Sequence, residues 1–416
     1  MELKEYKLGD IAEIITGVSY TPNDITTSGI RILRGGNIQA ETVLLKDDDV
    51  FLPMSYANNN QLKKYDTIIV SSTGSVDALA KGATIFEDLP NTQIGAFLRI
   101  IRPKEEKYAM IISMWCTSHF FRQYMMKKAK GTSINNIRTD FLTDFPIFFP
   151  ADGDLENTSN LYLNIEKKLL LNRQINQNLE ALARQLYDYW FVQFDFPNEE
   201  GKPYKSSGGK MVYNPILKRE IPEGWHSGNL YEIAKFSNGL ACQKYRPESN
   251  EKSLRVIKIR EMHEGFSKDT EFVTSNIPEA VKVYNGDVLF SWSASLEVML
   301  WAKGEGGLNQ HIFKVTARND FPRSFYYYQL LNYVSLFKLM AEARKTTMGH
   351  ITQDHLEQSR IAIPDSKEIT YQLEGKLAPI FDAIINNESE ITSLIKQRDE
   401  LLPLLMNGQV NFDLLV

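Results

Sequence analysis

Two long stretches of the chain have a hydrophobic pattern typical of helices that pack along one face. Over residues 155–190 and 366–407, apolar residues recur at alternating steps of three and four. This spacing is the seam of a coiled coil, and it predicts one long helix in each stretch. The first seam contains Leu161, Ile165, Lys168, Asn172, Ile175, Leu179, Leu182, Leu186 and Tyr189. The second contains Leu373, Leu377, Ile380, Ile384, Asn387, Ile391, Leu394, Arg398, Leu401 and Leu405.

The two seams match each other when they run in opposite directions. Placing Asn172 opposite Asn387 brings Ile175 to Ile384 and continues apolar pairs on both sides. We therefore predict an antiparallel intramolecular coiled coil with an asparagine layer. A polar seam residue costs stability, but it excludes slipped pairings and so fixes the register. The alternative is that each helix packs on a separate domain core.

Two residues of the second stretch are poor helix formers. Gly375 and Pro379 both lie near its beginning. Proline removes a backbone donor and crowds the preceding turn, so we expect a kink or a delayed start there. The pairing at this end of the coiled coil is therefore less secure.

Outside these stretches the pattern predicts shorter elements. Amphipathic helices are expected over about 107–129 and 322–343. Short runs rich in β-branched residues alternate with loops of Gly, Ser and Asn, at 66–70, 96–101, 254–259 and 287–290. Residues 196–222 contain Pro, Gly and Ser without periodicity, which predicts a linker or a long loop against the scaffold. The fold class is therefore α+β.

Several segments occur twice in the same order. LGDIAEIITG (8–17) returns as LYEIAKFSNG (230–239), and YDTIIVSSTGS (65–75) returns as GDVLFSWSAS (286–295). GTSINNIRTDFLTDFPIFFP (131–150) returns as TTMGHITQDHLEQSRIAIP (346–364), and each copy continues into a long helix. Four ordered matches indicate an internal duplication with pseudo-twofold character. We predict two similar domains, 1–150 and 223–364, long helices within 151–195 and 365–416, and a linker at 196–222.

Composition and charge add limits on location and partners. No apolar run reaches the roughly 18–20 residues of a membrane helix, so we expect no membrane span. Only Cys116 and Cys242 are available as thiols, which suggests reduced cysteines in a cytoplasmic protein. The net charge is −5, which by itself argues weakly against nucleic acid. The acidity gathers in residues 365–416, with 9 acidic against 4 basic residues, so binding to DNA remains open.

The motifs of common enzymes are absent. No Pro-Pro pair occurs, so the adenine-methyltransferase motif D/N-P-P-Y/F is missing, and no Gly-Lys pair is followed by Ser or Thr as a P-loop requires. His350 and His355 are five residues apart, which does not suit a helical metal site. Asp365, Glu374 and Lys376 loosely fit a restriction-nuclease pattern, but they lie where a helix is expected to begin. We predict no catalytic residue and no metal site.

Basic and small polar residues recur at matched places in the two repeats. Arginine and lysine neutralise phosphates, and arginine also makes paired hydrogen bonds to guanine. A solvated charge or an ordinary turn is the alternative for each of them, and phosphate contacts are not separable from base contacts at this point. The candidates in the first repeat are Arg31, Arg34, Lys127, Lys128, Lys130, Thr132 and Ser133. Those in the second repeat are Lys258, Arg260, Arg344, Lys345, Thr346 and Thr347.

With these features the chain resembles the specificity subunits of type I restriction–modification systems. The resemblance covers essentially the whole chain. It is carried by the duplicated unit with its L-x-D/E-I-A start, and by NRQINQNLEALA (172–183), FVQFDFP (191–197), KPYKSSGGKMVYNP (202–215), KREIPEGW (218–225) and RDELLPLLMNG (398–408). The recognition loops vary between such proteins, so no target sequence carries over.

The resemblance implies a non-catalytic subunit that reads double-stranded DNA through two target-recognition domains. It also implies methyltransferase subunits and motor/nuclease subunits as partners, which would carry S-adenosylmethionine, ATP and magnesium. Each domain would read one half of a split, asymmetric target, with the helices setting the gap. The aromatic run from Tyr187 to Phe196 would be a docking surface for the methyltransferases or, equally, would cap the helices by packing inside the fold.

Other functions stay open at this point. A stand-alone DNA-binding regulator would need no methyltransferase. An enzyme with an unrecognised site would methylate or cleave DNA as the isolated chain. An oligomeric scaffold would show no salt-dependent affinity for DNA.

Overall fold

The structure is a computed structural model, and it describes residues 3–39, 41–58, 60–74, 78–129, 136–150, 155–293, 295–343, 351 and 353–410. The chain divides into two compact units. Unit 1 contains residues 1–169 and 394–416, and unit 2 contains residues 170–393. The second unit is therefore an insertion within the first.

Unit 1 combines four small sheets with short helices, and the smallest sheet consists of two strands at residues 38–39 and 42–43. Strands β2, β10, β7 and β8 form one sheet in that order, β6, β3 and β9 form a second, and β1 pairs with β11. Its strands are β1 (Leu3–Lys7), β2 (Ala12–Thr16), β3 (Ile30–Leu33), β4 (Ile38–Gln39), β5 (Thr42–Val43), β6 (Val50–Leu52), β7 (Thr67–Val70), β8 (Gly82–Thr84), β9 (Thr92–Ile94), β10 (Leu98–Pro103) and β11 (Pro146–Pro150). Its short helices include α1 (Leu8–Ile11), α2 (Ala109–Thr117), α3 (His119–Ala129) and α4 (Thr139–Thr143).

Unit 2 repeats this strand order, with one additional strand in its second sheet. Strands β15, β22, β19 and β20 form the first sheet, β17, β16, β21 and β18 the second, and β14 pairs with β23. Its strands are β12 (Met211–Asn214), β13 (Arg219–Pro222), β14 (Trp225–Gly228), β15 (Ala234–Asn238), β16 (Ser253–Ile257), β17 (Phe272–Thr274), β18 (Lys282–Val283), β19 (Val288–Ser291), β20 (Glu297–Leu300), β21 (Gly306–Leu308), β22 (Ile312–Ala317) and β23 (Ile361–Pro364). Its helices include α6 (Leu230–Ile233), α7 (Ile259–Glu264), α8 (Arg323–Ala343) and α9 (Gln353–Glu357).

The matching sheets confirm the predicted internal repeat. In both repeats the central strand of the second sheet is antiparallel to one neighbour and parallel to the other: β3 to β6 and β9, and β16 to β17 and β21. The predicted β-rich runs all contain strands, namely β7, β10, β16 and β19. The predicted helices near 107–129 and 322–343 are also present, the first as two helices, α2 and α3, and the second as α8.

A glycine matched in the two repeats has a direct structural reason. A Cβ atom added to Gly17 would lie 2.1 Å from the carbonyl oxygen of Gly95, and one added to Gly239 would lie 2.2 Å from that of Asn309. Here two backbone segments approach each other, and any side chain would push them apart. The repeat in the sequence therefore preserves a close backbone contact in each unit.

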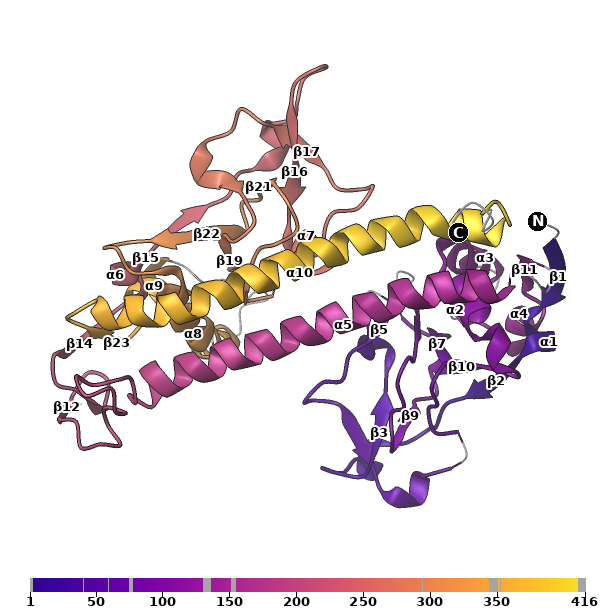
Figure 1. The fold of residues 1–416 in the computed structure, drawn as a ribbon, viewed down its shortest axis with the longest axis horizontal. Helices are drawn as coiled ribbons and strands as arrows, with labels where there is room; N and C mark the ends of the chain where they lie inside the picture. The colour runs from indigo at the N-terminus through magenta and orange to yellow at the C-terminus, as the bar shows by residue number, and fades with distance from the viewer. Residues whose placement is uncertain are drawn as a thin grey trace. The chain divides into compact units, whose positions relative to one another are not determined.

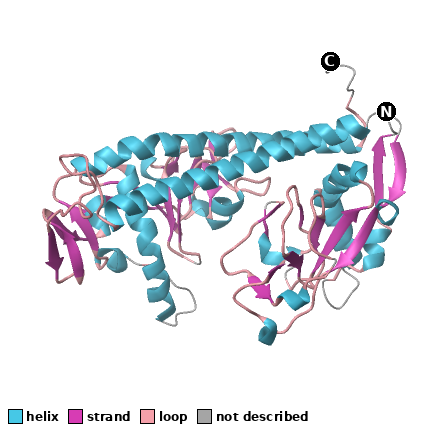
Figure 2. Ribbon diagram, turned by 60° about the horizontal axis from the view of Figure 1, so that its bottom comes forward, coloured by secondary structure: helices cyan, strands magenta, loops and turns pink. Residues whose placement is uncertain are grey.

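The two long helices exist and pack antiparallel, as predicted (Figures 1 and 2). Helix α5 spans Leu155–Tyr187 and continues as a π-helical turn to Val192, and α10 spans Glu368–Met406. Helix α10 is continuous through Gly375 and Pro379. The delayed start that we expected is therefore not observed. The seam of α10 is as predicted, with Leu377, Ile384 and Ile391 among its buried residues.

The predicted register of this pairing is wrong by one helical turn. Asn387 donates its amide to Asn176, not to Asn172, at 3.0 Å, and Asn172 donates to Glu390 at 2.9 Å. Asn176 also donates to Glu388 at 3.0 Å. A buried amide with this many partners costs little, so a polar residue takes a position where the heptad pattern places an apolar one.

The buried face of α5 also differs from the prediction. Ile175 and Leu182, predicted to be buried, are 37% and 46% exposed, while their neighbours Asn176 and Ala183 are buried. The buried face of α5 lies about one residue further along the chain than the apolar spacing indicates. Several apolar side chains of α5 therefore face outward.

Residues 196–222, predicted as a linker or a long loop, are folded into unit 2. Strands β12 and β13 pair as an antiparallel hairpin. Phe196 stacks on Tyr204 with ring centroids 4.7 Å apart and on Trp225 at 5.7 Å. Phe196 and Ile221 belong to the hydrophobic core of the unit. Aromatic packing therefore orders this segment, although its sequence has no periodicity that would predict a folded structure.

The two cysteines are buried and unpaired with each other. Burial raises the pKa of the Cys116 thiol, and it also raises the pKa of Cys242. No helix in the described part of the chain is both long enough and apolar enough to span a membrane.

Candidate nucleic-acid interface

Strand β3 of unit 1 and strand β16 of unit 2 carry equivalent basic residues. Arg31 of β3 lies opposite Thr92 of the parallel strand β9, and Arg255 of β16 lies opposite Gly306 of β21. The register therefore makes Arg31 equivalent to Arg255, and Arg34 equivalent to Lys258. From the sequence we expected Arg31 and Arg34 to match Lys258 and Arg260, and Arg255 was not among the expected residues. The pattern that could have shown this is R-I-L-R against R-V-I-K.

The first residue of each pair lies against an aromatic ring. The guanidinium of Arg31 is 5.2 Å from the ring centre of Phe51, and Arg31 Nη1 is 3.4 Å from Asp49. The guanidinium of Arg255 is 5.3 Å from the ring centre of Phe266. Such contacts orient a cation without removing its charge. Both arginines are therefore held in place beside their strands.

The second residue of each pair directly precedes a short helical turn. The backbone N–H of Arg34 donates to Asn37 Oδ1 at 2.7 Å, and that of Lys258 donates to Glu261 Oε2 at 3.2 Å. Asn37 and Glu261 are buried. A buried acceptor three residues later fixes the backbone at this point. The side chains of Arg34 and Lys258 therefore each project from a fixed backbone position at the end of a strand.

In the second repeat, Lys258 and Arg260 each form an ion pair with a carboxylate. Lys258 lies 2.5 Å from Glu271, and Arg260 lies 2.7 Å from the buried Glu261. The hydrogen bond from Lys258 lowers the pKa of Glu271, and the hydrogen bond to Glu261 raises the pKa of Arg260. Arg34 is exposed and donates to the carbonyl of Asp48 at 3.4 Å. The two repeats thus present similar positions in different electrostatic surroundings.

The remaining predicted residues divide into two groups. Lys127 and Lys128 lie in the last turn of α3 and are exposed. The others lie outside the described residues: Lys130, Thr132, Ser133, Arg344, Lys345, Thr346 and Thr347.

Equivalent backbone hydrogen bonds join the ends of the matched strands in each unit. In unit 1, Gly95 donates to the carbonyl of Leu33 at 2.9 Å, and Ile137 donates to that of Ser71 at 2.7 Å. In unit 2, the equivalent bonds run from Asn309 to Ile257 at 3.0 Å and from Ile351 to Trp292 at 3.1 Å. We call the backbone around these bonds the strand-end edge of each unit. It includes residues 34, 71 and 97 in unit 1, and residues 258, 292 and 311 in unit 2.

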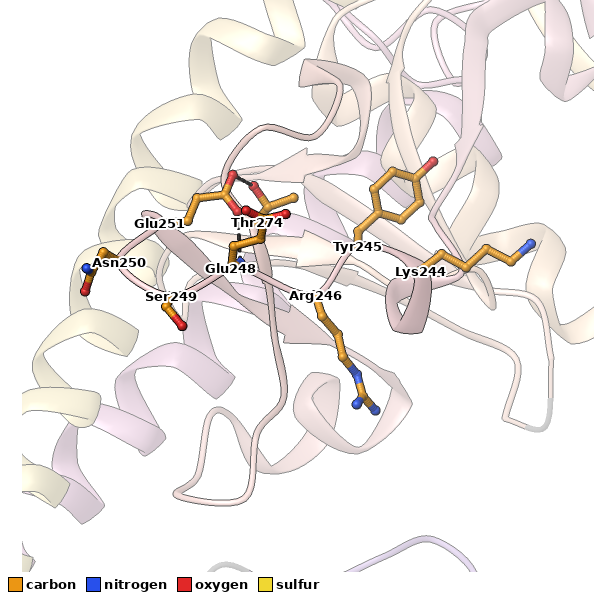
Figure 3. A pocket seen from close by; sticks show the side chains of 8 residues that line it. All are labelled: Lys244, Tyr245, Arg246, Glu248, Ser249, Asn250, Glu251 and Thr274. Carbon is orange, nitrogen blue, oxygen red and sulfur yellow. Dashed lines mark hydrogen bonds between the residues drawn. The ribbon is translucent and has the colours of Figure 1, made fainter.

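A shallow pocket lies at the start of β16, at the opposite end of this strand from Lys258 (Figure 3). It has a volume of about 530 Å³. Thr274 donates to Glu251, while the side chains of Lys244 and Arg246 point away from that pair in Figure 3. The lining residues are Lys244, Tyr245, Arg246, Glu248, Ser249, Asn250, Glu251 and Thr274. This mixture of charges does not form a catalytic acid–base pair or a nucleophile with its base.

The carboxylates that loosely matched a nuclease pattern have other contacts. Asp365 is 2.6 Å from His226, and Glu374 accepts the backbone N–H of Ser324 at 2.8 Å. Glu374 and Lys376 lie inside α10, as expected. Within the described residues, no three of the His, Cys, Asp and Glu side chains are grouped to hold a metal ion.

The aromatic run at the end of α5 is largely internal. Tyr187, Trp190, Phe191, Phe194 and Phe196 are all buried, while Tyr189 is 37% exposed. Tyr187 stacks on Tyr328 of α8 with ring centroids 4.8 Å apart. Of the two roles left open by the sequence, packing inside the fold is the one that the structure supports.

Comparison with known proteins gives consistent matches. The family model described as the type I restriction modification DNA specificity domain matches residues 222–400. The MjaIX specificity subunit of Methanocaldococcus jannaschii is 23% identical over 99% of this chain and 89% of its own length. The HindI specificity subunit of Haemophilus influenzae is 22% identical over 98% of this chain and 99% of its own length.

A solved structure shares the fold. The crystal structure of the type I restriction–modification S subunit from M. genitalium matches with a TM-score of 0.55 at 12% identity. The match covers 97% of this chain and 96% of that chain.

Proposed function

Because this chain belongs to the DNA specificity subunits of type I restriction–modification systems, we propose that each of its two repeats reads one half of a bipartite, asymmetric DNA target. In this family the subunit itself is non-catalytic and binds no cofactor, and S-adenosylmethionine and ATP sit on other subunits. The duplex is the ligand of this chain, and magnesium acts on the partner subunits.

The observation that carries this proposal is the equivalence of the two strand-end edges. Arg34 and Lys258 occupy the same register position in two separate units, and each is positioned by a buried acceptor three residues later. Two domains that recognise different half-sites need side chains that differ but are placed by the same backbone geometry. Phosphate contacts from lysine and arginine position such a protein, while contacts to base edges give specificity.

The primary test is to map methylated adenines in DNA from cells that express this chain with its methyltransferase subunit. We expect methylation within one split sequence with two unlike halves. The substitution Arg34→Ala should weaken the effect of the first half only, and Lys258→Ala that of the second half only. Equal losses at both halves for each variant would contradict independent readers, and a symmetric or unsplit target would contradict the proposal itself.

The long helices, which enter both units, would set the gap between the two halves of the target. Inserting four residues, about one helical turn, in both α5 and α10 should change the preferred gap and leave each half-sequence unchanged. A gap that stays constant while methylation persists would exclude this role. The comparison needs the same mapping experiment with the altered chain.

We further propose that the methyltransferase subunit docks on an apolar stripe of α5. Leu171, Ile175, Leu182 and Tyr189 are between 37% and 54% exposed. At 3.6 residues per turn Leu171, Ile175 and Leu182 project within about 40° of one another along α5, and Tyr189 follows in the π-helical turn that continues the helix. Such a stripe on an exposed helix face suits a partner helix. It offers a separate surface from the strand-end edges.

Docking can be tested with polar substitutions in this stripe. The double variant Ile175→Ser, Leu182→Ser should lose capture of the methyltransferase subunit while DNA binding by the chain persists. Val212→Ser is the control, because Val212 is 45% exposed on the β12–β13 hairpin. Unchanged capture by the double variant would exclude this stripe. A native chain that binds its target DNA but never captures a methyltransferase would instead favour the stand-alone regulator.

The motor/nuclease subunits complete the restriction enzyme in this proposal. Their recruitment is tested by restriction of unmethylated target DNA when all the subunits are present.

A further inference from the structure

Phe97 is an exposed aromatic residue in a tight turn between β9 and β10. Its side chain is 68% exposed. A single exposed apolar side chain is ordinary on a protein surface and calls for no explanation by itself. The position of Phe97 and the backbone that carries it distinguish this residue from the others.

The backbone on both sides of Phe97 is held by an unusual number of hydrogen bonds. The carbonyl of Phe97 accepts from the backbone N–H groups of Ser71 and Ser72, at 2.9 and 3.1 Å, and from the Ser71 hydroxyl at 3.0 Å. The guanidinium of Arg99 donates to the carbonyls of Ala96 and Leu98, at 2.9 and 2.8 Å. The turn is therefore rigid, although the ring that it carries has no comparable packing.

The ring is placed at the strand-end edge that carries Arg34. Gly95, two residues before Phe97, donates to the carbonyl of Leu33, and Leu33 precedes Arg34. A rigid backbone that presents an apolar ring on the same strand-end edge as an exposed cation is typical of a prepared binding surface. The cation attracts phosphate, and the ring is available for an apolar contact.

The second repeat has a different arrangement at the equivalent position. Strand register makes His311 equivalent to Phe97 and Trp292 equivalent to Ser71. The rings of His311 and Trp292 are 5.7 Å apart, and His311 is only partly exposed. In unit 1 the small Ser71 leaves the Phe97 ring uncovered. The same backbone thus presents a bare apolar ring in one repeat and a covered polar ring in the other.

We propose that Phe97 contacts the 5-methyl group of a thymine in the first half-site, and that position 97 and its equivalent 311 help the two repeats to read different sequences. This inference rests on the proposed function, because it assigns one base contact within that recognition. Apolar side chains distinguish thymine in the major groove by its methyl group, where the other bases present polar atoms. Arg34 anchors the adjacent phosphate and brings the ring to the base edge.

The experiment uses the full chain in complex with its methyltransferase subunit and short duplexes with the mapped target. Each thymine of the first half-site is replaced in turn by uracil, which lacks only the 5-methyl group. With the native chain, one replacement should lower methylation or binding by roughly fourfold, the scale expected for the loss of one buried methyl group. With Phe97→Ala, the thymine and uracil duplexes should behave alike, and discrimination at the second half-site should be unchanged.

Phe120→Ala serves as the matched control, because Phe120 is a 51% exposed phenylalanine on α3 of the same unit. It should keep the native preference for thymine. The inference is overturned if no thymine in the first half-site shows the uracil effect, if Phe97→Ala retains that effect, or if it weakens all duplexes equally. If the native complex methylates no split target at all, the proposed function fails instead, so the two failures are distinguishable.

Discussion

The buried ion cluster around Arg398 gives a quantitative test of how α10 is attached to unit 1. The side chain of Arg398 is 9% exposed and lies 3.3 Å from Glu166 of α5, whose side chain is 8% exposed. Arg398 also pairs with Glu41, which is 37% exposed and keeps access to water. Neighbouring Glu41, Glu166 and Asp399 raise the pKa of Arg398 above its ordinary value against the opposing effect of burial. We consider the change of Arg398 to methionine.

The cost of this change follows from the carboxylate that it leaves behind. Methionine fills much of the volume but supplies no charge, so Glu166 remains buried without its cation. Removal of one partner of a buried ion pair typically costs about 3–5 kcal/mol. At about 1.4 kcal/mol per factor of ten, local opening of unit 1 should become between a hundredfold and a few thousandfold more frequent. The partly exposed Glu41 is left out of this figure because water screens it.

Hydrogen exchange resolved by peptide is the appropriate measurement, because a chain with two units does not unfold in one step. Protection should fall in unit 1, for example in β10, and remain unchanged in β22 of unit 2. Lys396→Met is the control: the 77% exposed Lys396 lies 3.9 Å from Glu400, and exposed pairs of this kind contribute little. The double change of Arg398→Met and Glu166→Leu should recover most of the loss.

Two outcomes would refute this reasoning. If Arg398→Met changes protection no more than Lys396→Met does, the buried pair contributes no net stability. If protection falls equally in both units, the effect is not confined to unit 1. In either case Arg398 would have another role in the chain.

Three further outcomes are expected. Gly17→Ala should destabilise unit 1 and Gly239→Ala should destabilise unit 2, each by about 1–3 kcal/mol because the new methyl group overlaps a carbonyl oxygen, as measured by the same hydrogen-exchange experiment. Burial raises the pKa of the Cys116 thiol, so its thiolate should not form as the pH rises to about 9, and a thiol reagent should label it only after denaturation. Arg34→Ala should reduce by about one the slope of log affinity against log salt for target DNA, whereas a slope that does not change would mean that Arg34 contacts no phosphate.

Much of the fold could be predicted because it depends on local pattern. The heptad spacing located α5 and α10, and the duplicated motifs indicated the repeated sheets. The matched Gly17 and Gly239 lie at the end of one of these motifs, although their close backbone contact is visible only in the structure. These features are visible in the sequence because each depends on residues that are near in the chain or copied within it.

The features that could not be predicted depend on which partners a residue finds in three dimensions. The register of the helices moved by one turn because Asn176 finds Asn387 and Glu388, and no spacing rule shows that such partners satisfy a buried amide. The stacking of Phe196 on Tyr204 and Trp225 likewise orders a segment without periodicity.

The candidate interface was only partly accessible for the same reason. Arg31, Arg34 and Lys258 stood out as basic residues in matched places. The equivalence of Arg255 to Arg31 is established by the strand register, which pairs each with a parallel neighbour, and in the sequence it is marked only by R-I-L-R against R-V-I-K. Phe97 carries no charge and belongs to no motif, so only its exposure and its fixed turn identify it.

The insertion of unit 2 within unit 1 has a consequence for the order of events on the ribosome. Leu405 and Met406 belong to the same hydrophobic core as Leu8 and Trp115, yet residues 170–393 are synthesised in between. Translation proceeds at about 5–20 residues per second, so roughly 10–45 s pass between synthesis of the first part of unit 1 and synthesis of the helix that completes its core. Unit 2 can mature during this interval, while apolar surface of its predecessor stays uncovered. Translation speed and chaperone supply should therefore govern the yield of the N-terminal half.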